Sequence, residues 1–303
     1  MSGSVADQRK TAIEAQPFIR VSKNSGFFTG IASSYAEIWR YRGLLAQLTR
    51  REIRARYKSS ALGVLWGLIR PLTQLLIYYF AIGQVLGAAR SIPEFAIFVF
   101  SGLTLWGLLV EVLTLSPQTL LGNGAIVKKV FVPRELFTLS AMANALLNFA
   151  IQCCLLVIFS VVVGAAPRPS EIGYGLLALG IVAALALGLG LLISAINVYI
   201  RDVEHFVGVL VAIFFWLSPI VYSFAFIRHI LSGVWLQIYL ANPVTVAVMG
   251  FQKAIWSAGS DMQGAWPEDL LPRLLVALVC AIGFAFIAQR VYSRMQRSIA
   301  QEL

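Results

Sequence analysis

Long apolar segments separated by short polar ones dominate the sequence from residue 61 onward. A helix that crosses the hydrocarbon core of a bilayer needs about 20 apolar residues. Segments of that order lie at residues 61–86, 95–116, 136–163, 175–197, 207–224 and 270–290. They do not alternate polar and apolar residues, as the strands of a membrane barrel would. Because a backbone in lipid must satisfy its own hydrogen bonds, each segment is predicted to be a transmembrane helix.

The segment 225–258 contains further apolar residues, but Asn242 and Pro243 interrupt it. The apolar pieces at 234–240 and 244–251 are each too short to cross a membrane. Proline disfavours helical backbone at the residue before it, so the break is expected at this pair. We predict two short re-entrant helices between spans five and six. A single broken span, which would place the C-terminus on the opposite side, is the alternative.

Upstream of the first span, hydrophobic residues recur at helical spacing between residues 35 and 58 among seven arginines and lysines. This pattern predicts a basic amphipathic helix in the membrane interface. It serves either as a topology anchor or as a docking surface for a partner. Four regions are therefore expected: a polar N-terminal tail at 1–30, an amphipathic cytoplasmic interface helix at 31–60, a transmembrane domain at 61–290 and a cytoplasmic tail at 291–303.

Composition supports the membrane assignment. Of the 303 residues, 59% are hydrophobic and only 13% are charged, against about a quarter charged in soluble domains. A soluble fold of this size leaves too much of its chain at the surface to hide that many apolar side chains. A soluble enzyme, a disordered chain and a secreted disulfide scaffold are therefore excluded. The three cysteines show no metal-ligand spacing, and no metal site is expected.

The net charge of +10 is distributed unevenly along the chain. With six spans, 18 of the 24 lysines and arginines fall on the side that holds the N-terminal residues, and five fall on the other side. The positive-inside rule then places both termini in the cytoplasm. Membrane topology therefore accounts for the basic charge, and nucleic acid is not an expected partner.

Two charged residues, Arg70 and Glu111, lie inside predicted spans, where charges are costly and often functional. They either share a depth and pair, or each extends toward the interface. The glycines and lysines between residues 122 and 129 have the wrong spacing for a phosphate-binding loop. Carboxylates and histidines do not cluster as an acid–base enzyme would require.

Aromatic residues are concentrated in the first, second and fifth predicted spans. The side chains in question are Trp66, Tyr78, Tyr79, Trp106, Phe214, Phe215, Trp216 and Tyr222. One interpretation is ordinary packing and contact with lipid at the membrane interfaces. The other is a series of flat apolar surfaces with polar tips, over which a sugar chain could slide without tight binding.

Five short motifs over residues 45–255 resemble, in the same order, those of ABC-2-type permeases that export O-antigen, capsule or teichoic acid. The first is the basic run at 51–63, which continues to Trp66 and Pro71. The others are represented by Lys128, Lys129, Pro133, Arg134 and Glu135, then by Asn197, Arg201 and Asp202, then by Ser218, Pro219, Ile220 and Tyr222, and finally by Asn242 with Pro243. Each motif is weak by itself, but the five together are specific.

The resemblance implies that two copies of this chain form the path and that two copies of a separate ATPase subunit supply the energy. ATP and magnesium would bind to that partner, and this chain would hold no cofactor. The residues expected to dock on the ATPase are Arg50, Arg54, Arg56, Lys58, Lys128, Lys129, Pro133, Arg134 and Glu135. Those expected along the path are the aromatic residues above together with Arg70 and Glu111. Those expected at an outer gate or exit are Ser218, Pro219, Asn242 and Pro243.

The expected function is export of a lipid-diphosphate-linked glycan across the inner membrane of a bacterium, with Arg54, Arg56 and Lys58 attracting the phosphates. An ABC-2 exporter of small amphipathic molecules or drugs shares the fold and is the alternative. A membrane enzyme that builds the glycan would need an acid–base set, which the sequence lacks. An ion-driven carrier would need carboxylates near the middle of the bilayer, where the chain offers only Glu111.

Overall fold

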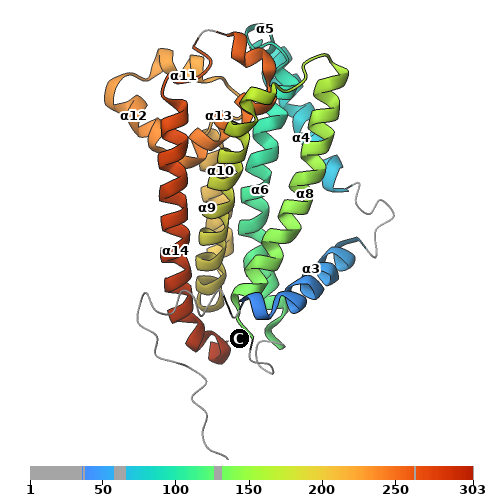
Figure 1. Cartoon of the computed structure of the whole chain (residues 1–303), viewed down its shortest axis with the longest axis vertical. Helices are drawn as coiled ribbons and strands as arrows, with labels where there is room; N and C mark the ends of the chain where they lie inside the picture. Colours follow the sequence, from blue (N-terminus) through green and yellow to red (C-terminus); the bar gives the residue numbers. More distant parts are fainter. Residues whose placement is uncertain (1–35, 37, 58–65, 126–131, 263, 303) are drawn as a thin grey trace, which may run out of the picture. The chain divides into compact units, whose positions relative to one another are not determined.

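The computed structural model describes residues 36, 38–57, 66–125, 132–262 and 264–302 (Figure 1). Within these ranges, all regular secondary structure is helical. By its contacts the chain divides into two units, residues 1–39, most of which lie outside the described part, and residues 40–303. All the elements described below belong to the second unit, and the predicted polar tail at 1–30 lies outside the described residues.

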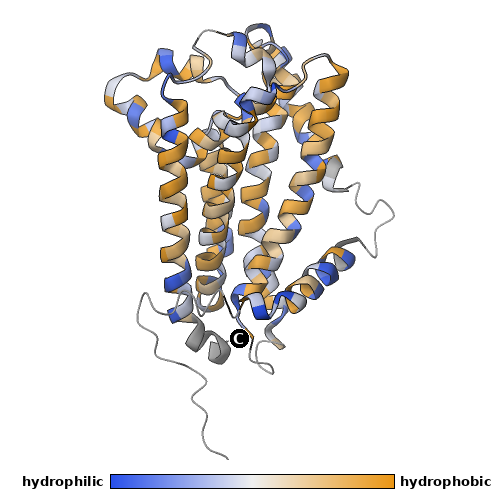
Figure 2. Ribbon diagram, viewed as in Figure 1, coloured by the Kyte–Doolittle hydropathy of each residue, from blue (hydrophilic) through white to orange (hydrophobic). Residues whose placement is uncertain are grey.

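Four helices are long and apolar enough to cross a membrane: α6 (Phe95–Gly122), α8 (Glu135–Val162), α9 (Ile172–Tyr199), which a short 3-10 turn η3 (Pro169–Glu171) precedes, and α14 (Leu270–Glu302). They correspond to the second, third, fourth and sixth predicted spans, so these four helices are confirmed. Figure 2 shows hydrophobic residues along most of the length of α8, α9 and α14, with hydrophilic residues gathered near the helix ends.

The fifth predicted span is shorter in the structure, and the first is described only from residue 66. Helix α4 (Trp66–Tyr78) continues without a break into the π-helix η2 (Tyr79–Val85), and residues 61–65 lie outside the described part. Helix α10 (Val203–Trp216) has 14 residues, which at 1.5 Å per residue is about 21 Å and less than a full crossing. The prediction that helix continues to residue 224 is wrong, because the chain turns near Pro219, which lacks an N–H and restricts the residue before it.

The break predicted at Asn242 and Pro243 is confirmed. Helices α12 (Gly233–Ala241) and α13 (Pro243–Ile255) meet there at an angle of 78°. The side-chain oxygen of Asn242 accepts a hydrogen bond from the Val244 N–H at 3.0 Å, and Pro243 occupies the first helical position. By length and composition the described residues therefore contain four candidate spans, or five if this bent pair counts as one. The six-span arrangement stays a prediction.

Helix α6 forms the centre of the bundle and packs against α8, α9 and α13, while α14 lies along α9 (Figure 1). In its most apolar window, 78% of the residues of α6 are buried, against 28% in α8, 44% in α9 and 22% in α14. Helix α13 is also largely buried. The central position of α6 fixes which side chains of the surrounding helices can meet in the interior.

Helix α3 (Arg42–Tyr57) lies within the segment 31–60 and packs against α8, while its placement in a membrane interface stays a prediction. It lies at the end of the bundle that holds the last residues of α6 and the first residues of α8, because hydrogen bonds join α3 to Asn123 and Ser140. We call this end the α3 end. The opposite end, called the far end, holds α5 (Ala88–Ser91), α11 (Phe224–Ile230), α12 and the 3-10 turn η4 (Ser257–Asp261).

Candidate functional site

Helices α4, α6 and α10 bring predicted path residues into one group, which we call the aromatic cluster: Tyr78, Trp106, Phe215 and Trp216. The ring of Phe215 stacks on Tyr78 with 5.6 Å between ring centroids and 21° between ring planes. It also meets Trp106 edge-on at 6.0 Å and Trp216 edge-on at 5.4 Å. The arrangement agrees with the offset and edge-to-face geometries that aromatic rings prefer.

The aromatic cluster extends from the interior to the surface. Phe215 and Trp106 are buried, whereas 57% of Trp216 is exposed. The Tyr222 hydroxyl donates a hydrogen bond to the backbone oxygen of Trp216 at 2.7 Å, which ties the turn after α10 to the end of that helix. Phe214 is also exposed. The backbone of Trp66 opens α4, but its side chain lies outside the described residues.

A second row of rings was not predicted. It begins at Tyr79 and continues through Phe95, Phe98, Trp256 and Trp266, with neighbouring centroids 6.5, 6.4, 4.9 and 5.8 Å apart. The indole N–H of Trp256 donates to the backbone oxygen of Pro93 at 2.8 Å. Tyr79 was singled out by the sequence, but the contact of α6 with Trp256 depends on how α13 returns through the bundle. These contacts hold the start of α6 against the residues that follow α13.

Of the two charged residues inside predicted spans, Glu111 contacts a neighbouring helix. The Asn148 amide donates a hydrogen bond to the Glu111 carboxylate at 2.5 Å, which links α6 to α8. The side chain of Arg70 is exposed on α4. The ion pairs among described residues are Arg168 with Asp261 and Arg273 with Asp269, so the pairing alternative for Arg70 and Glu111 is not seen there. Asn148 was not predicted to matter.

The predicted gate residues before α11 are buried and held by α13. Ser218 and Pro219 are both buried. The Gln252 side chain donates to the backbone oxygen of Pro219 at 2.8 Å, and Thr245 donates to the backbone oxygen of Leu217 at 3.2 Å. Sequence reasoning missed Gln252, although a polar side chain within an apolar stretch is the signal that could have found it.

On α3, the predicted docking residues Arg50 and Arg54 are exposed. Between them, Glu52 accepts a hydrogen bond from the Ser140 hydroxyl at 2.7 Å, and Arg51 donates to the side-chain oxygen of Asn123. These bonds attach α3 to α8 and to the end of α6. The backbone of Arg56 belongs to α3 but its side chain is outside the described part, as are Lys58, Lys128 and Lys129.

The remaining predicted docking residues lie at the start of α8 and just before it. Pro133 and Arg134 are half-buried. Glu135 is only 5% exposed, and the Ser293 hydroxyl of α14 donates to its carboxylate at 3.5 Å. Its carboxylate therefore faces helices of this chain, and a docking contact through Glu135 would require α8 and α14 to separate locally.

The far end is tied by polar contacts outside the spans. Arg168 and Asp261 form an ion pair at 2.6 Å, and their hydrogen bond raises the pKa of Arg168. The hydrogen bond from Arg273 lowers the pKa of Asp269, which directly precedes α14. Among the described residues, no three His, Cys, Asp or Glu side chains are placed to hold a metal ion.

Comparison with known proteins gives one consistent result. Residues 43–256 match the model of the family described as ABC-2 type transporter. The O-antigen export system permease protein RfbA of Klebsiella pneumoniae is 31% identical over 210 residues, which cover 69% of this chain and 78% of that protein. The protein of the same name from Myxococcus xanthus is 29% identical over 262 residues, which cover 84% of this chain and 95% of that protein.

Proposed function

Because this chain belongs to the ABC-2 type transporter family, a family of multi-pass membrane transport proteins, we propose that it is the permease subunit of an ATP-driven exporter of a lipid-linked polysaccharide. The observation that carries the choice of cargo is the similarity to O-antigen export permeases along most of both chains. The expected location is the inner membrane of a bacterium, with six crossings and both termini in the cytoplasm.

The aromatic cluster supports a path for a polymer. Its rings offer flat apolar faces, and Trp216 brings them to the surface of α10. Aromatic faces contact the apolar side of sugar rings without strong directional bonds, so a chain of sugars can move past them. Glu111 and Arg70 would lie along the same route, and the segment around Pro219 and Pro243 would form the exit.

A second copy of this chain would complete the path. The faces of α4, η2 and α10 carry large exposed side chains that the described part of this chain does not cover, among them Ile77, Phe80, Phe206, Phe214 and Trp216. Two-fold symmetric pairs are the commonest way in which identical subunits associate. We propose that α4 and α10 of two copies face each other and enclose the glycan between them.

The energy would come from two copies of an ABC ATPase, which would bind ATP and magnesium, so that this chain is a non-catalytic transport subunit without a cofactor of its own. Helix α3 is the proposed docking element, because Arg50 and Arg54 are exposed on it. Its bonds to Ser140 and Asn123 would pass a rigid-body movement from the ATPase to α8 and α6. Arg54, Arg56 and Lys58 would also attract the diphosphate of the lipid-linked cargo.

The test uses the permease reconstituted in vesicles with its ATPase and a lipid-linked glycan. We expect ATP-dependent delivery of the glycan to the opposite leaflet and stimulation of ATP hydrolysis. The triple charge reversal R54E, R56E and K58E should lower both by about tenfold, which corresponds to the loss of one or two charge-assisted contacts. The matched control is R90E, because Arg90 is an exposed arginine of the far end.

Three outcomes would contradict parts of this proposal. Stimulation by small amphipathic drugs but not by the glycan would favour the drug exporter of the same fold. Sugar transfer by the purified chain without an ATPase would favour an enzyme. Unchanged export in the triple variant would remove the proposed role of the three basic residues.

A further inference from the structure

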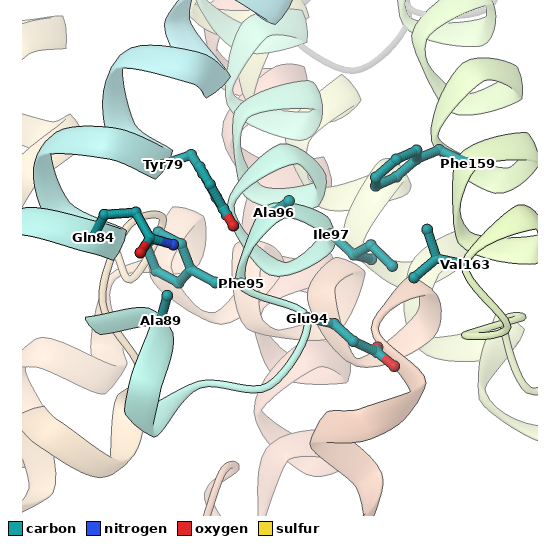
Figure 3. A pocket seen from close by; sticks show the side chains of 9 residues that line it. All are labelled: Tyr79, Gln84, Ala89, Glu94, Phe95, Ala96, Ile97, Phe159 and Val163. Atoms are coloured by element: carbon teal, nitrogen blue, oxygen red, sulfur yellow. The ribbon is translucent and has the colours of Figure 1, made fainter. Parts of the chain in front are cut away.

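A pocket of about 270 Å³ lies at the far end, where η2, α5, the start of α6 and the end of α8 come together (Figure 3). Its lining includes Tyr79, Gln84, Glu94, Phe95, Phe159 and Val163. Figure 3 shows Tyr79 and Gln84 on one side, Phe159 and Val163 on the other, and Glu94 between them. Small-ligand sites typically begin at about 300 Å³ and combine apolar walls with a few polar groups.

Glu94 is unusual in its backbone. It has a φ of 52°, and it is the one non-glycine residue with positive φ in the described part of the chain. A left-handed conformation suits glycine, which has no Cβ atom to crowd the backbone, or asparagine, whose short polar side chain can form local hydrogen bonds. Such strain concentrates at functional sites, where the surrounding structure holds it in place.

Its side chain is equally unusual. Glu94 precedes the first residue of α6, yet its carboxylate makes no capping hydrogen bond to that helix. One carboxylate oxygen, Oε2, is buried and has no hydrogen-bond partner. A buried carboxylate oxygen without a donor is costly, so local structure gives no reason to keep Glu at this position. Glu94 lines the pocket, so a rotation of its side chain would present this shielded oxygen to a ligand that donates hydrogen bonds.

The lining narrows the chemistry of that ligand. None of the residues that line the pocket carries a positive charge, so Glu94 would repel a phosphate there. A sugar matches better, because its hydroxyl groups donate to a carboxylate and to an amide oxygen. Gln84 and the Tyr79 hydroxyl can exchange further hydrogen bonds with it. The rings of Phe95 and Phe159 can contact the apolar face of the sugar.

We infer that this pocket binds one sugar unit of the glycan at the far end of the permease, with Glu94 as the hydrogen-bond acceptor. The inference rests on the proposed function, because only a glycan exporter would meet a sugar there. It adds a binding step outside the aromatic cluster, since Glu94 and Gln84 belong to neither that cluster nor the docking surface.

The test measures saturation-transfer NMR of methyl hexopyranosides with the permease–ATPase complex in phosphatidylglycerol nanodiscs. The variant E94G removes the carboxylate and also relieves the backbone, so it should fold at least as well as the natural chain. We expect the affinity for the sugar to fall by about tenfold in E94G, as when a hydrogen bond to a charged group is lost. E268Q is the matched control, because Glu268 is an exposed acidic residue of the same end.

Each outcome either supports or overturns the proposed sugar site. Loss of transfer in E94G with an unchanged unfolding temperature, and full transfer in E268Q, would support the sugar site. Equal transfer in E94G and the natural chain would overturn it, as would absence of transfer in the natural chain. Saturation transfer to the headgroup of added phosphatidylethanolamine, without any signal for the sugar, would overturn it in favour of an ammonium headgroup.

The glycan-stimulated ATPase activity of the same samples separates the two proposals. A complex that hydrolyses ATP in response to the lipid-linked glycan, and whose sugar signal ignores Glu94, refutes only the pocket. A complex of the natural chain that gives no response to the glycan refutes the proposed function itself.

Discussion

Helices α6 and α10 are both apolar and both carry large aromatic residues, yet they occupy opposite environments. Helix α6 buries 18 of its 28 residues. Helix α10 buries only Phe215, while Phe206, Val209 and Ile213 are at least half exposed. In water, such an apolar surface would drive association or aggregation. In lipid it costs little, so hydrophobicity by itself does not decide which helix is central.

Helices α6 and α10 differ in how closely neighbouring residues approach their backbones and in their polar contacts. At Gly102 of α6, an added Cβ atom would lie 3.1 Å from the Gln252 amide and 3.2 Å from the backbone of Ile220. At Gly208 of α10, the space within 4 Å is open. Helices in membranes associate through small residues and interhelical hydrogen bonds, because lipid removes most of the hydrophobic driving force. The sites where α6 is indispensable are therefore those where a neighbour touches its backbone.

The most severe test of this difference between α6 and α10 replaces each of the two glycines with valine. We expect G102V to lower the free energy of unfolding by about 3 kcal/mol, because the turn that holds Ile220 must move and the bonds of Gln252 are disturbed. The measurement is thermal or denaturant unfolding in detergent. G208V is the matched variant in α10 and should leave stability nearly unchanged. Equal losses in the two variants would show that α10 is as tightly packed as α6.

A second comparison uses two neighbouring phenylalanines of α10. We expect F215A to cost about 2 kcal/mol, because the ring contacts Tyr78 and Trp106; the cost is below that in a soluble core, since lipid replaces water as the outside medium. Because 41% of Phe214 is exposed, F214A should change stability by much less. Unfolding in detergent measures both, and a larger loss for F214A would contradict the assigned burial.

The difference between the two helices also shows which helix boundaries can be predicted from the sequence. The apolar lengths of α6, α8, α9 and α14 were predictable, since each segment ends where polar residues begin. The end of α10 was missed, because residues 217–224 remain largely apolar. Pro219 is a local signal for the turn, but the hydrogen bonds that hold it come from Gln252 and Thr245 on another helix. Hydropathy carries no information about such distant contacts.

The candidate site follows the same rule. The aromatic character of Tyr78, Trp106, Phe215 and Trp216 could be read from the sequence, but their meeting depends on how α4, α6 and α10 pack. Glu94 gave no signal, because a polar residue before an apolar span is ordinary. Its positive φ and its unpartnered oxygen exist only in the folded chain. Residue type was therefore predictable, whereas strain and contact were not.

The smallest expected effect concerns the polar tie between the two compared helices at the start of α10. The Gln118 amide of α6 donates to the Glu204 carboxylate at 2.8 Å in an exposed position. We expect E204A to lower the free energy of unfolding by about 0.5 kcal/mol, because exposed hydrogen bonds contribute little, and to speed hydrogen exchange in the first turns of α10.

D202A is the control: Asp202 is also acidic and also near the helix start, but it makes no capping hydrogen bond. Both variants remove the same favourable charge from the positive end of the helix, so any excess effect of E204A measures the bond to α6. If D202A accelerated exchange as much as E204A does, the attachment of α10 to the core would be electrostatic and would not depend on Gln118.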